Sequence, residues 1–479
     1  MLFNSIEYLF FLPIVFFLYW FVFRSRKWQN ALVVVASYVF YGWWDWRFLV
    51  LIAGTTLCSY ASGLLLERNE GHRRRQQWIS AGNIALNLAV LCLFKYFNFF
   101  GENLAALARL VGWETDWVTL DILLPVGISF YTFQALSYTI DVYRGSIRPT
   151  HDIVAFFAFI SFFPQLVAGP IERATNLLPQ FLAPRRFSYP EAVDGMRQIL
   201  WGLFKKMVVA DNCATAVNDI FADWQQLDGN SLFLGALFFA FQIYGDFSGY
   251  SDIAIGSARL FGVRLMKNFD YPYFSRNIAE FWRRWHISLT TWFRDYIYFP
   301  LGGSRCSRAK AMRNTLVVFL VSGFWHGANW TYVCWGVYHG LLFLPLYLMG
   351  KNRKYTSVVA AGRLLPSWRE AGQMLVTFFF VLVGWVFFRA ESMTQAVGYL
   401  WRMVTTFRPV LPEHGNDPLI YIGLLLVVEW LQRTRPFGLS LPERGLLGHR
   451  WVRWTLYLGL FIAVFLLAGQ QEKFIYFQF

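Results

Sequence analysis

Thirteen apolar runs divide this chain of 479 residues, and most are close to the length that a helix needs to cross a lipid bilayer. A hydrocarbon core about 30 Å thick takes roughly 20 residues of helix. Lipid offers no hydrogen bonds to exposed backbone, so helices are the ordinary way for such runs to span it. We therefore expect an all-α polytopic membrane protein, with one to three short runs re-entrant. The runs lie near residues 6–23, 30–47, 48–66, 79–99, 121–143, 152–168, 196–213, 231–256, 313–327, 329–349, 372–390, 418–432 and 453–469.

The low content of charged residues agrees with this class. Charged residues make up 15% of the chain and apolar residues 56%, whereas a soluble domain carries about 25% charged residues. No soluble domain and no repeat is evident, so the simplest prediction is one integral membrane domain over residues 1–479. The first run, Ile6–Phe23, follows no basic leader and precedes no small-residue cleavage site. We expect it to be the first spanning helix rather than a cleaved signal.

Basic residues cluster in short loops beside the apolar runs, which is the pattern of cytoplasmic membrane flanks. The net charge of +14 therefore indicates contact with membrane lipids and excludes nucleic acid as a partner. Basic flanks at 24–27, 68–75 and 433–453 are expected inside, and the loop at 101–120 outside. Both termini then lie outside, which favours ten or twelve crossings among the thirteen runs.

The five cysteines are scattered singly, without metal-ligand spacing and in an odd number. A disulfide framework or a metal centre is therefore not expected. No phosphate-binding glycine loop and no redox motif is present either. We expect a chain that works with no resident metal and no cofactor.

One histidine stands in an apolar run among glycines and tryptophans, in Ser322-Gly323-Phe324-Trp325-His326-Gly327-Ala328-Asn329-Trp330. Ionisable groups at membrane depth are costly and mark functional sites by default, and histidine is suited to moving protons near neutral pH. Trp325 is expected to wall a narrow slot. Asn329 is expected near the same helical face as His326, where its amide would bond the ring or a substrate oxygen. The alternative is a packing histidine that bonds across helices.

A second histidine lies in Phe281-Trp282-Arg283-Arg284-Trp285-His286. Apolar residues from 281 to 299 fall at helical spacing and predict one amphipathic helix that stops at Pro300. Such a helix either lines a cavity mouth or lies in the membrane interface with an incidental histidine. Arg283 and Arg284 are expected to meet either lipid phosphates or an anionic, nucleotide-bearing donor.

Other polar positions in apolar sequence give weaker signals. Two prolines and a glycine predict a broken helix at 163–173. Asp246 and Asp252 indicate buried turns that break a helix, or a wet cavity. His339 would point away from His326 on one continuous helix, so we expect it either to be structural or to support the site without touching substrate.

Four stretches carry a resemblance that covers nearly the whole chain. They are Phe-Phe-Pro-Gln-Leu-Val-Ala-Gly-Pro-Ile at 162–171, Asp-Phe-Ser-Gly-Tyr-Ser-Asp at 246–252, Phe-Trp-Arg-Arg-Trp-His-Ile-Ser-Leu at 281–289 and Gly-Phe-Trp-His-Gly at 323–327. Together they resemble the membrane-bound O-acyltransferase family. The similarity is closest to the bacterial branch with the alginate and peptidoglycan O-acetyltransferase membrane subunits and the teichoic-acid D-alanyl transferase. It implies a ring of about ten to twelve tilted helices around a thin core, with a transmembrane tunnel.

The resemblance also implies a function. It maps the family's essential histidine onto His326 and its second histidine onto His286. It implies an O-acetyltransferase of the bacterial inner membrane that takes an acetyl group from a cytoplasmic donor, expected to be acetyl-CoA, and exports it. A periplasmic partner then esterifies an extracytoplasmic polysaccharide. The expected substrate-binding residues are Trp325, Asn329, Arg283 and Arg284.

Two alternatives come from other classes of protein. Discontinuous helices and inner acidic residues also suit a transporter or channel for a lipid or polysaccharide precursor. No paired repeats with matching broken helices support that reading. The second alternative is a structural subunit of a membrane assembly.

The C-terminal residues 474–479 read Phe-Ile-Tyr-Phe-Gln-Phe. Aromatic residues here are typical of a belt that anchors a last helix at the membrane surface. The segment also resembles the aromatic tail of this acyltransferase branch or of its small companion protein, in which a tyrosine is proposed to carry the acyl group. That resemblance makes Tyr476 a candidate acetyl acceptor, whose phenol, with an ordinary pKa of about 10, needs a base to attack.

Overall fold

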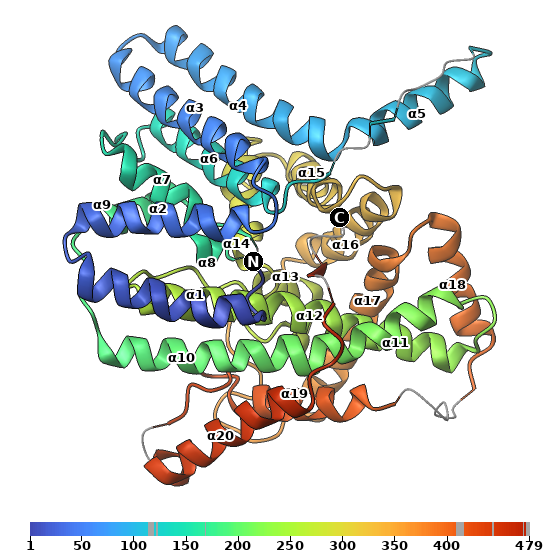
Figure 1. Ribbon diagram of the computed structural model, residues 1–479. Helices are drawn as coiled ribbons and strands as arrows, with labels where there is room; N and C mark the ends of the chain where they lie inside the picture. The colour runs from blue at the N-terminus through green and yellow to red at the C-terminus, as the bar shows by residue number, and fades with distance from the viewer. Residues whose placement is uncertain are drawn as a thin grey trace. The chain divides into compact units, whose positions relative to one another are not determined.

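Helices are the only regular secondary structure in the part of the chain that the computed structural model describes (Figure 1). The described residues are 1–113, 119–120, 123–167, 169–408, 416–442, 445–472 and 474–475. Each of the thirteen apolar runs coincides, wholly or in part, with a helix. The expected all-α class is confirmed.

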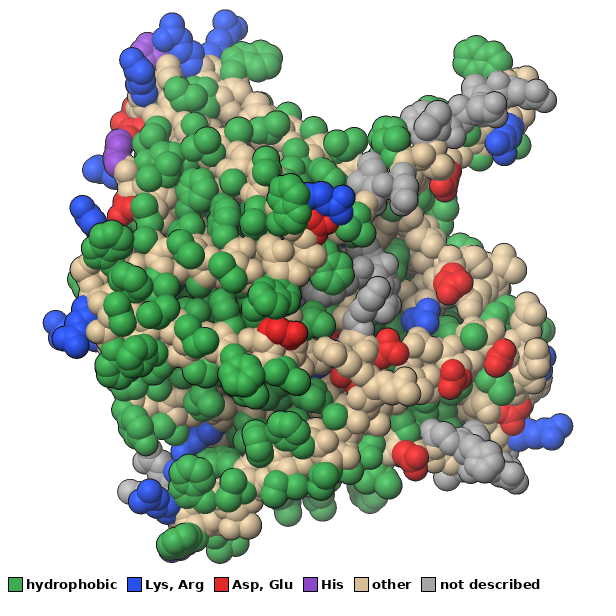
Figure 2. All heavy atoms as spheres, viewed as in Figure 1, with side chains coloured by type: hydrophobic (Ala, Val, Ile, Leu, Met, Phe, Trp, Pro, Cys, Tyr) green, Lys and Arg blue, Asp and Glu red, His purple; other side chains and the backbone are tan. Residues whose placement is uncertain are grey.

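Five helices are long and apolar enough to cross a membrane, namely α3 (Phe48–Arg68), α4 (Arg73–Lys95), α12 (Gly229–Leu260), α16 (Trp330–Leu348) and α17 (Trp368–Arg389). Shorter apolar helices occupy Ile6–Val22 and Pro418–Leu431. Hydrophobic side chains cover much of the surface in view in Figure 2, and large ones such as Val50, Leu375 and Ile420 are exposed. Exposed apolar surface of this extent indicates membrane contact. The chain is a polytopic membrane protein, while the number of crossings, the ring and the tunnel stay predictions.

The helices group into two compact units. The first comprises residues 1–192 and 257–266, and the second comprises residues 193–256 and 267–479, so that the boundary falls within two helices, α10 (Tyr189–Leu203) and α12. The single integral domain over 1–479 stays a prediction. Besides α3 and α4, the first unit contains α1 (Ile6–Phe17), η1 (Leu18–Val22), α2 (Arg26–Gly42), α5 (Phe97–Leu110), α6 (Ile128–Tyr143), α7 (Ile153–Ser161), α8 (Phe163–Leu166) and α9 (Ala174–Leu182).

Polar side chains on α3, α4 and α6 meet inside the first unit. The side-chain amide of Asn83 donates to the hydroxyl oxygens of Thr139 at 2.6 Å and of Ser59 at 3.4 Å. Gly63 lets Tyr138 pack directly against α3, because a Cβ atom at this glycine would lie 2.4 Å from the tyrosine hydroxyl. Small and hydrogen-bonding residues commonly hold helices together in lipid, where apolar contact alone gives little preference.

The second unit is built on α12, most of whose length is buried. Two further helices, α15 (Arg308–His326) and α16, pack as a close antiparallel pair. A Cβ atom at Gly323 would lie 2.3 Å from the Tyr332 carbonyl oxygen, and one at Gly336 would lie 2.3 Å from that of Phe319. Besides α17, the unit also contains η2 (Phe204–Ala210), α11 (Asp211–Ala222), η3 (Pro272–Phe274), α13 (Ile278–Arg284), α14 (Ile287–Phe293), η4 (Arg294–Tyr298), α18 (Met393–Thr405), α19 (Pro418–Leu431), η5 (Leu446–Gly448) and α20 (Arg450–Leu466).

The single amphipathic helix predicted for 281–299 is wrong. The chain forms α13, breaks at Trp285 and His286, and continues as α14 and η4. The break follows from the left-handed backbone of His286, with φ 44° and ψ 54°. Six of the seven residues of α13 are buried and Arg283 is the exposed one, so α13 lacks the broad solvated face of an interfacial helix.

Three other local predictions have clear outcomes. The break at 163–173 is confirmed, since α8 ends at Leu166 and α9 begins at Ala174. The connection at 101–120 is helical over its first part, which belongs to α5, and its place outside the membrane stays a prediction. Helix-breaking turns at Asp246 and Asp252 are also wrong, because both residues lie within continuous α12. The alternative of a wet cavity fits Asp252, which lines a polar cavity of about 20 Å³, room for about one water molecule.

Candidate active site

His326 is the last residue of α15 and is buried, with 3% of its surface exposed. The helix ends because Gly327 takes an extended conformation (φ −168°, ψ 156°). Glycine is required there, since a Cβ atom would lie 2.2 Å from the Tyr332 ring. The chain then turns into α16, with Asn329 as its cap. A tight reversal between two helices therefore sets the position of this histidine.

Aromatic rings surround His326. Its ring centroid lies 4.9 Å from that of Trp325, 5.0 Å from that of Trp335 and 5.2 Å from that of Phe388. Trp325 therefore contacts His326 together with Trp335 and Phe388, two residues that the sequence did not indicate. A contact of Trp325 with substrate stays a prediction. Rings of this kind exclude water and strengthen electrostatic interactions at the imidazole.

His286 lies beside His326. Their ring centroids are 6.5 Å apart, and the Trp325 ring lies 6.1 Å from His286 as well. His286 has 1% of its surface exposed, and burial lowers its pKa from 6.5 to about 3. At neutral pH its ring is therefore uncharged and able to accept a proton or a hydrogen bond.

Asn268 fixes the orientation of the His286 ring. Its side-chain oxygen lies 3.0 Å from Nδ1 of the histidine and also accepts from the Ser288 hydroxyl at 2.9 Å. Its backbone oxygen accepts from the Ile287 N–H at 2.9 Å. Because the amide oxygen only accepts, Nδ1 carries the proton and Nε2 is the basic nitrogen. Asn268 has no motif around it, and the sequence did not single it out.

A pocket of about 850 Å³ extends over α13, α14 and α15, within the size range of small-molecule sites. Ile287, adjacent to His286 in the chain, lines it, and so does Ser322, one helical turn before His326. The pocket thus reaches the neighbours of both histidines. Its lining includes four arginines, which are Arg283, Arg294, Arg308 and Arg353.

Arg283 and Arg284 have different surroundings. Arg283 lines the pocket and donates to backbone oxygens of Asn352, at 2.8 Å, and Tyr355. Arg284 does not line the pocket. Its guanidinium is paired with the carboxylates of Asp270 at 2.7 Å and Glu280 at 3.1 Å. The predicted role of Arg284 in binding substrate stays a prediction, and its contacts are those of a structural ion pair.

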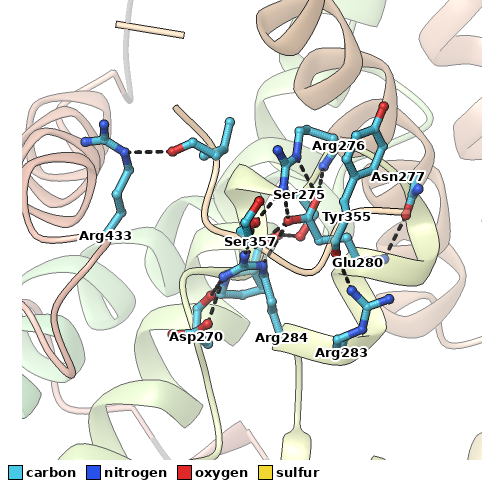
Figure 3. A network of polar contacts seen from close by, with 12 residues as sticks. Asp270, Ser275, Arg276, Asn277, Glu280, Arg283, Arg284, Tyr355, Ser357 and Arg433 are labelled. Atoms are coloured by element: carbon cyan, nitrogen blue, oxygen red, sulfur yellow. Dashed lines mark hydrogen bonds and ion pairs between the residues drawn. The ribbon is translucent and has the colours of Figure 1, made fainter. Parts of the chain in front are cut away.

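Glu280 is the centre of this buried network (Figure 3). Arg276 places its guanidinium on both carboxylate oxygens, at 2.9 and 3.0 Å. The backbone oxygen of Ser357 accepts from Arg276 at 2.6 Å and from Arg284 at 3.3 Å. The network therefore ties the connection between α16 and α17, which carries Arg353 of the pocket, to α13.

Asn329 does not share a helical face with His326, because α15 ends before it. Its side-chain oxygen caps α16 by accepting the Thr331 N–H at 3.0 Å, and its amide donates to the Glu391 backbone oxygen at 2.9 Å. These contacts hold the reversal after His326. A contact with substrate stays a prediction.

His339 packs against Trp335, which also contacts His326. Its ring lies 5.1 Å from both Trp335 and Trp282 and is fully buried. Gly384 makes room for it, since a Cβ atom there would lie 2.6 Å from Nε2. The prediction assumed one continuous helix through both histidines, which is wrong, since α15 ends at His326 and His339 lies in α16. Its structural or supporting role stays a prediction.

The last described residues, Phe474 and Ile475, are buried in the second unit, with 0% and 2% of their surface exposed. The Phe474 ring lies 4.4 Å from the Tyr250 ring and 6.0 Å from that of Phe247. A belt on the membrane surface is therefore not the role of these two residues. Tyr476 and residues 477–479 lie outside the described residues, and the acceptor role of Tyr476 stays a prediction.

Comparison with known proteins identifies the class to which this site belongs. The model described as MBOAT, membrane-bound O-acyltransferase family, matches residues 146–388. Over the full length of both chains, the protein is 38% identical to the probable alginate O-acetylase AlgI of Pseudomonas putida. The chain belongs to the membrane-bound O-acyltransferase family. The predicted class, a membrane-bound acyltransferase, is confirmed, and the transporter and assembly-subunit alternatives are not supported.

Two further relatives of this acyltransferase are named for O-acetylation. The probable alginate O-acetylase AlgI of Pseudomonas aeruginosa is 42% identical over 84% of this chain and 74% of that one. The peptidoglycan O-acetyltransferase of Helicobacter pylori is 34% identical over 84% of this chain and 80% of its own. The family match includes both His286 and His326.

Proposed function

We propose that this acyltransferase takes an acetyl group from acetyl-CoA at the cytoplasmic face of the bacterial inner membrane and exports it, and that a periplasmic partner esterifies an extracytoplasmic polysaccharide. The observation that carries the proposal is the buried histidine pair, with ring centroids 6.5 Å apart, beside an arginine-lined pocket. The choice of an acetyl group and of a polysaccharide as its final acceptor rests on relatives that are named for alginate and peptidoglycan O-acetylation. Both termini are extracytoplasmic in this proposal, in agreement with the basic flanks.

The donor occupies the pocket of about 850 Å³. Coenzyme A carries phosphate charges at one end and a long, mostly uncharged arm at the other. Guanidinium groups bind phosphate in a fixed planar geometry, and four arginines line this pocket. The uncharged arm is then free to run along Ile287 and Ser322 toward the histidine pair. Arg308 and Arg353 join Arg283 as donor-binding residues in this scheme.

The transfer step needs a base. His326 accepts the proton of the acceptor hydroxyl as its oxygen bonds to the thioester carbon. The tetrahedral intermediate then collapses, the C–S bond breaks, and the sulfur leaves with the electron pair and takes up the proton. His286, with Nδ1–H held by Asn268, keeps Nε2 as an acceptor that orients the hydroxyl. The aromatic rings around His326, including that of Trp325, keep water from hydrolysing the thioester.

Tyr476 is the first acceptor in this proposal. Its phenol attacks once the base removes the proton, and the aryl ester that forms has a better leaving group than an alkyl ester, because a phenol has a pKa of about 10. That ester is able to pass the acetyl group on to the partner. Support comes from the described residues just before it, which are buried near His286 rather than on the surface.

Proteoliposomes that contain the purified protein test this function. Labelled acetyl-CoA is supplied outside the vesicles, and acetylation of the protein is followed by intact mass. The proposal expects labelled wild-type protein, and no stable label in Tyr476→Phe, which keeps the ring but lacks the hydroxyl. Consumption of a lipid-linked acyl donor with no use of acetyl-CoA would contradict the donor, and equal labelling of Tyr476→Phe would contradict the acceptor.

A further inference from the structure

Three charged side chains of the second unit take no part in the chemistry above, yet all are buried. Lys206, in η2, lies 2.7 Å from an oxygen of Asp211 and 2.9 Å from one of Asp246, and each of the three has 2% of its surface exposed. Two carboxylates around one ammonium leave an excess of negative charge away from water when all are ionised. Such a cluster is costly unless further hydrogen bonds satisfy it.

The C-terminal segment supplies these hydrogen bonds. The backbone N–H of Ile475 donates to Oδ2 of Asp246 at 2.7 Å. Nζ of Lys206 donates to the backbone oxygen of Glu472 at 3.2 Å. Hydrogen bonds to charged groups are shorter and stronger than those between neutral groups. The segment is therefore bound through its peptide groups at two of the three charges.

The same helix that carries Asp246 also connects the segment to the histidine site. The ring of Phe474 packs on Tyr250, one turn further along α12, with centroids 4.4 Å apart. It also lies 6.0 Å from the Phe247 ring, and the centroid of the Phe247 ring lies 4.6 Å from that of His286. One turn of α12 thus carries Asp246, which accepts from Ile475, Tyr250, which packs on Phe474, and Phe247, which contacts His286.

We propose that Lys206, Asp211 and Asp246 anchor the C-terminal segment and so set which residue follows at the histidine site. Because the bonds are made to the backbone, they fix the register of the segment, and Tyr476 is the next residue after the anchored Ile475. The three charged residues are positioning residues, since they act through the segment. The role of Tyr476 as the acetyl acceptor rests on the proposed function, whereas the anchoring of the segment does not.

Carboxypeptidase digestion of the full-length protein in detergent, followed by intact mass, tests the anchor. Asp246→Asn weakens the acceptor and unbalances the charges, and Ile475→Pro removes the donating N–H and leaves the buried charges intact. We expect both variants to lose C-terminal residues at least tenfold faster than the wild type. The control Glu429→Gln alters a buried carboxylate that accepts from Tyr244 instead, and it should digest at the wild-type rate. Digestion of Ile475→Pro at the wild-type rate would overturn the anchor.

Acetyl transfer to the polymer, measured on the same preparations, tests the positioning. We expect at least a tenfold fall for Ile475→Pro and wild-type transfer for Glu429→Gln. A released segment with undiminished transfer would overturn the positioning role. Failure of the proposed function would appear differently. The wild-type protein would transfer no acetyl group, while its C-terminal segment would still be digested more slowly than that of Asp246→Asn and Ile475→Pro.

Discussion

The side-chain oxygen of Asn268 lies 3.0 Å from Nδ1 of His286, and this contact decides which ring nitrogen carries the proton. The same oxygen accepts the hydroxyl of Ser288, and the Asn268 amide donates to Ser251 at 3.2 Å. Every polar atom of the Asn268 side chain thus has a partner in the second unit. The basic nitrogen of His286 is consequently set by a residue that need not touch substrate.

Replacement of Asn268 should change the pH dependence of acetyl transfer. In Asn268→Asp, a carboxylate beside Nδ1 stabilises the charged ring and raises the pKa of His286. The acid limb of the pH–rate profile should move to higher pH. Asn268→Leu removes the acceptor and should lower kcat about tenfold or more, as loss of an orienting partner commonly does. A profile of Asn268→Asp that overlays the wild type would contradict this role.

Burial of His286 should make the fold sensitive to acid. Its folded-state pKa of about 3 lies below the ordinary 6.5, so the unfolded chain takes up this proton at higher pH than the folded chain. The stability is fully present above pH 6.5 and is lost as the pH falls from 6.5 toward 3, by an amount on the order of a few kcal/mol. Thermal unfolding between pH 7 and 5 should show a smaller acid loss for His286→Gln than for the wild type. An equal loss of thermal stability between pH 7 and 5 in the two proteins would contradict the contribution of His286.

The pocket arginines should act on donor binding rather than on the chemical step. Arg308→Ala and Arg353→Ala each remove one guanidinium from the pocket lining, where the proposed donor would gain about 1.5–3 kcal/mol from a charge-assisted hydrogen bond. We expect KM for acetyl-CoA to rise about tenfold or more while kcat changes little. Arg369→Ala, outside this pocket, is the control and should leave KM unchanged. A fall in kcat with constant KM would assign these arginines another role.

The close pairing of α15 and α16 should be intolerant of side chains at its glycines. A Cβ atom at Gly323 would lie 2.3 Å from a backbone oxygen, whereas one at Gly372 would meet nothing within 4 Å. Gly323→Val should lower the thermal midpoint by several degrees and reduce transfer, because His326 sits at the end of this pair. Gly372→Ala should be neutral or slightly stabilising, since alanine favours helix. Equal midpoints for the two variants would contradict the close packing.

Much of the fold was predictable from the sequence because it depends on local patterns. Apolar runs of spanning length predicted α3, α12, α16 and α17, and the prolines and the glycine predicted the break near 163–173. The break at His286 carries no local signal. A histidine with positive φ is held there by the rest of the structure, including Asn268, and not by its neighbours in sequence.

The candidate site was predictable in its parts but not in its assembly. The setting of His326 and His286 pointed to function, yet only the fold shows that two residues forty positions apart meet. The expected position of Asn329 assumed a continuous helix, which Gly327 ends. Arg308 and Arg353 belong to ordinary basic flanks in the sequence, and the pocket alone distinguishes them from lipid-facing arginines.

The most direct test of the account compares two buried histidines that pack on the same tryptophan. His326 and His339 both contact Trp335, at 5.0 and 5.1 Å between ring centroids, so replacing either by alanine opens a similar cavity. Acetyl transfer is measured at saturating acetyl-CoA on preparations with equal folded yield. We expect a fall of about 10²–10⁴-fold for His326→Ala, the usual contribution of a general base, and a change of only a few fold for His339→Ala. Similar rates for the two variants, or undiminished transfer by His326→Ala, would show that His326 is not the base.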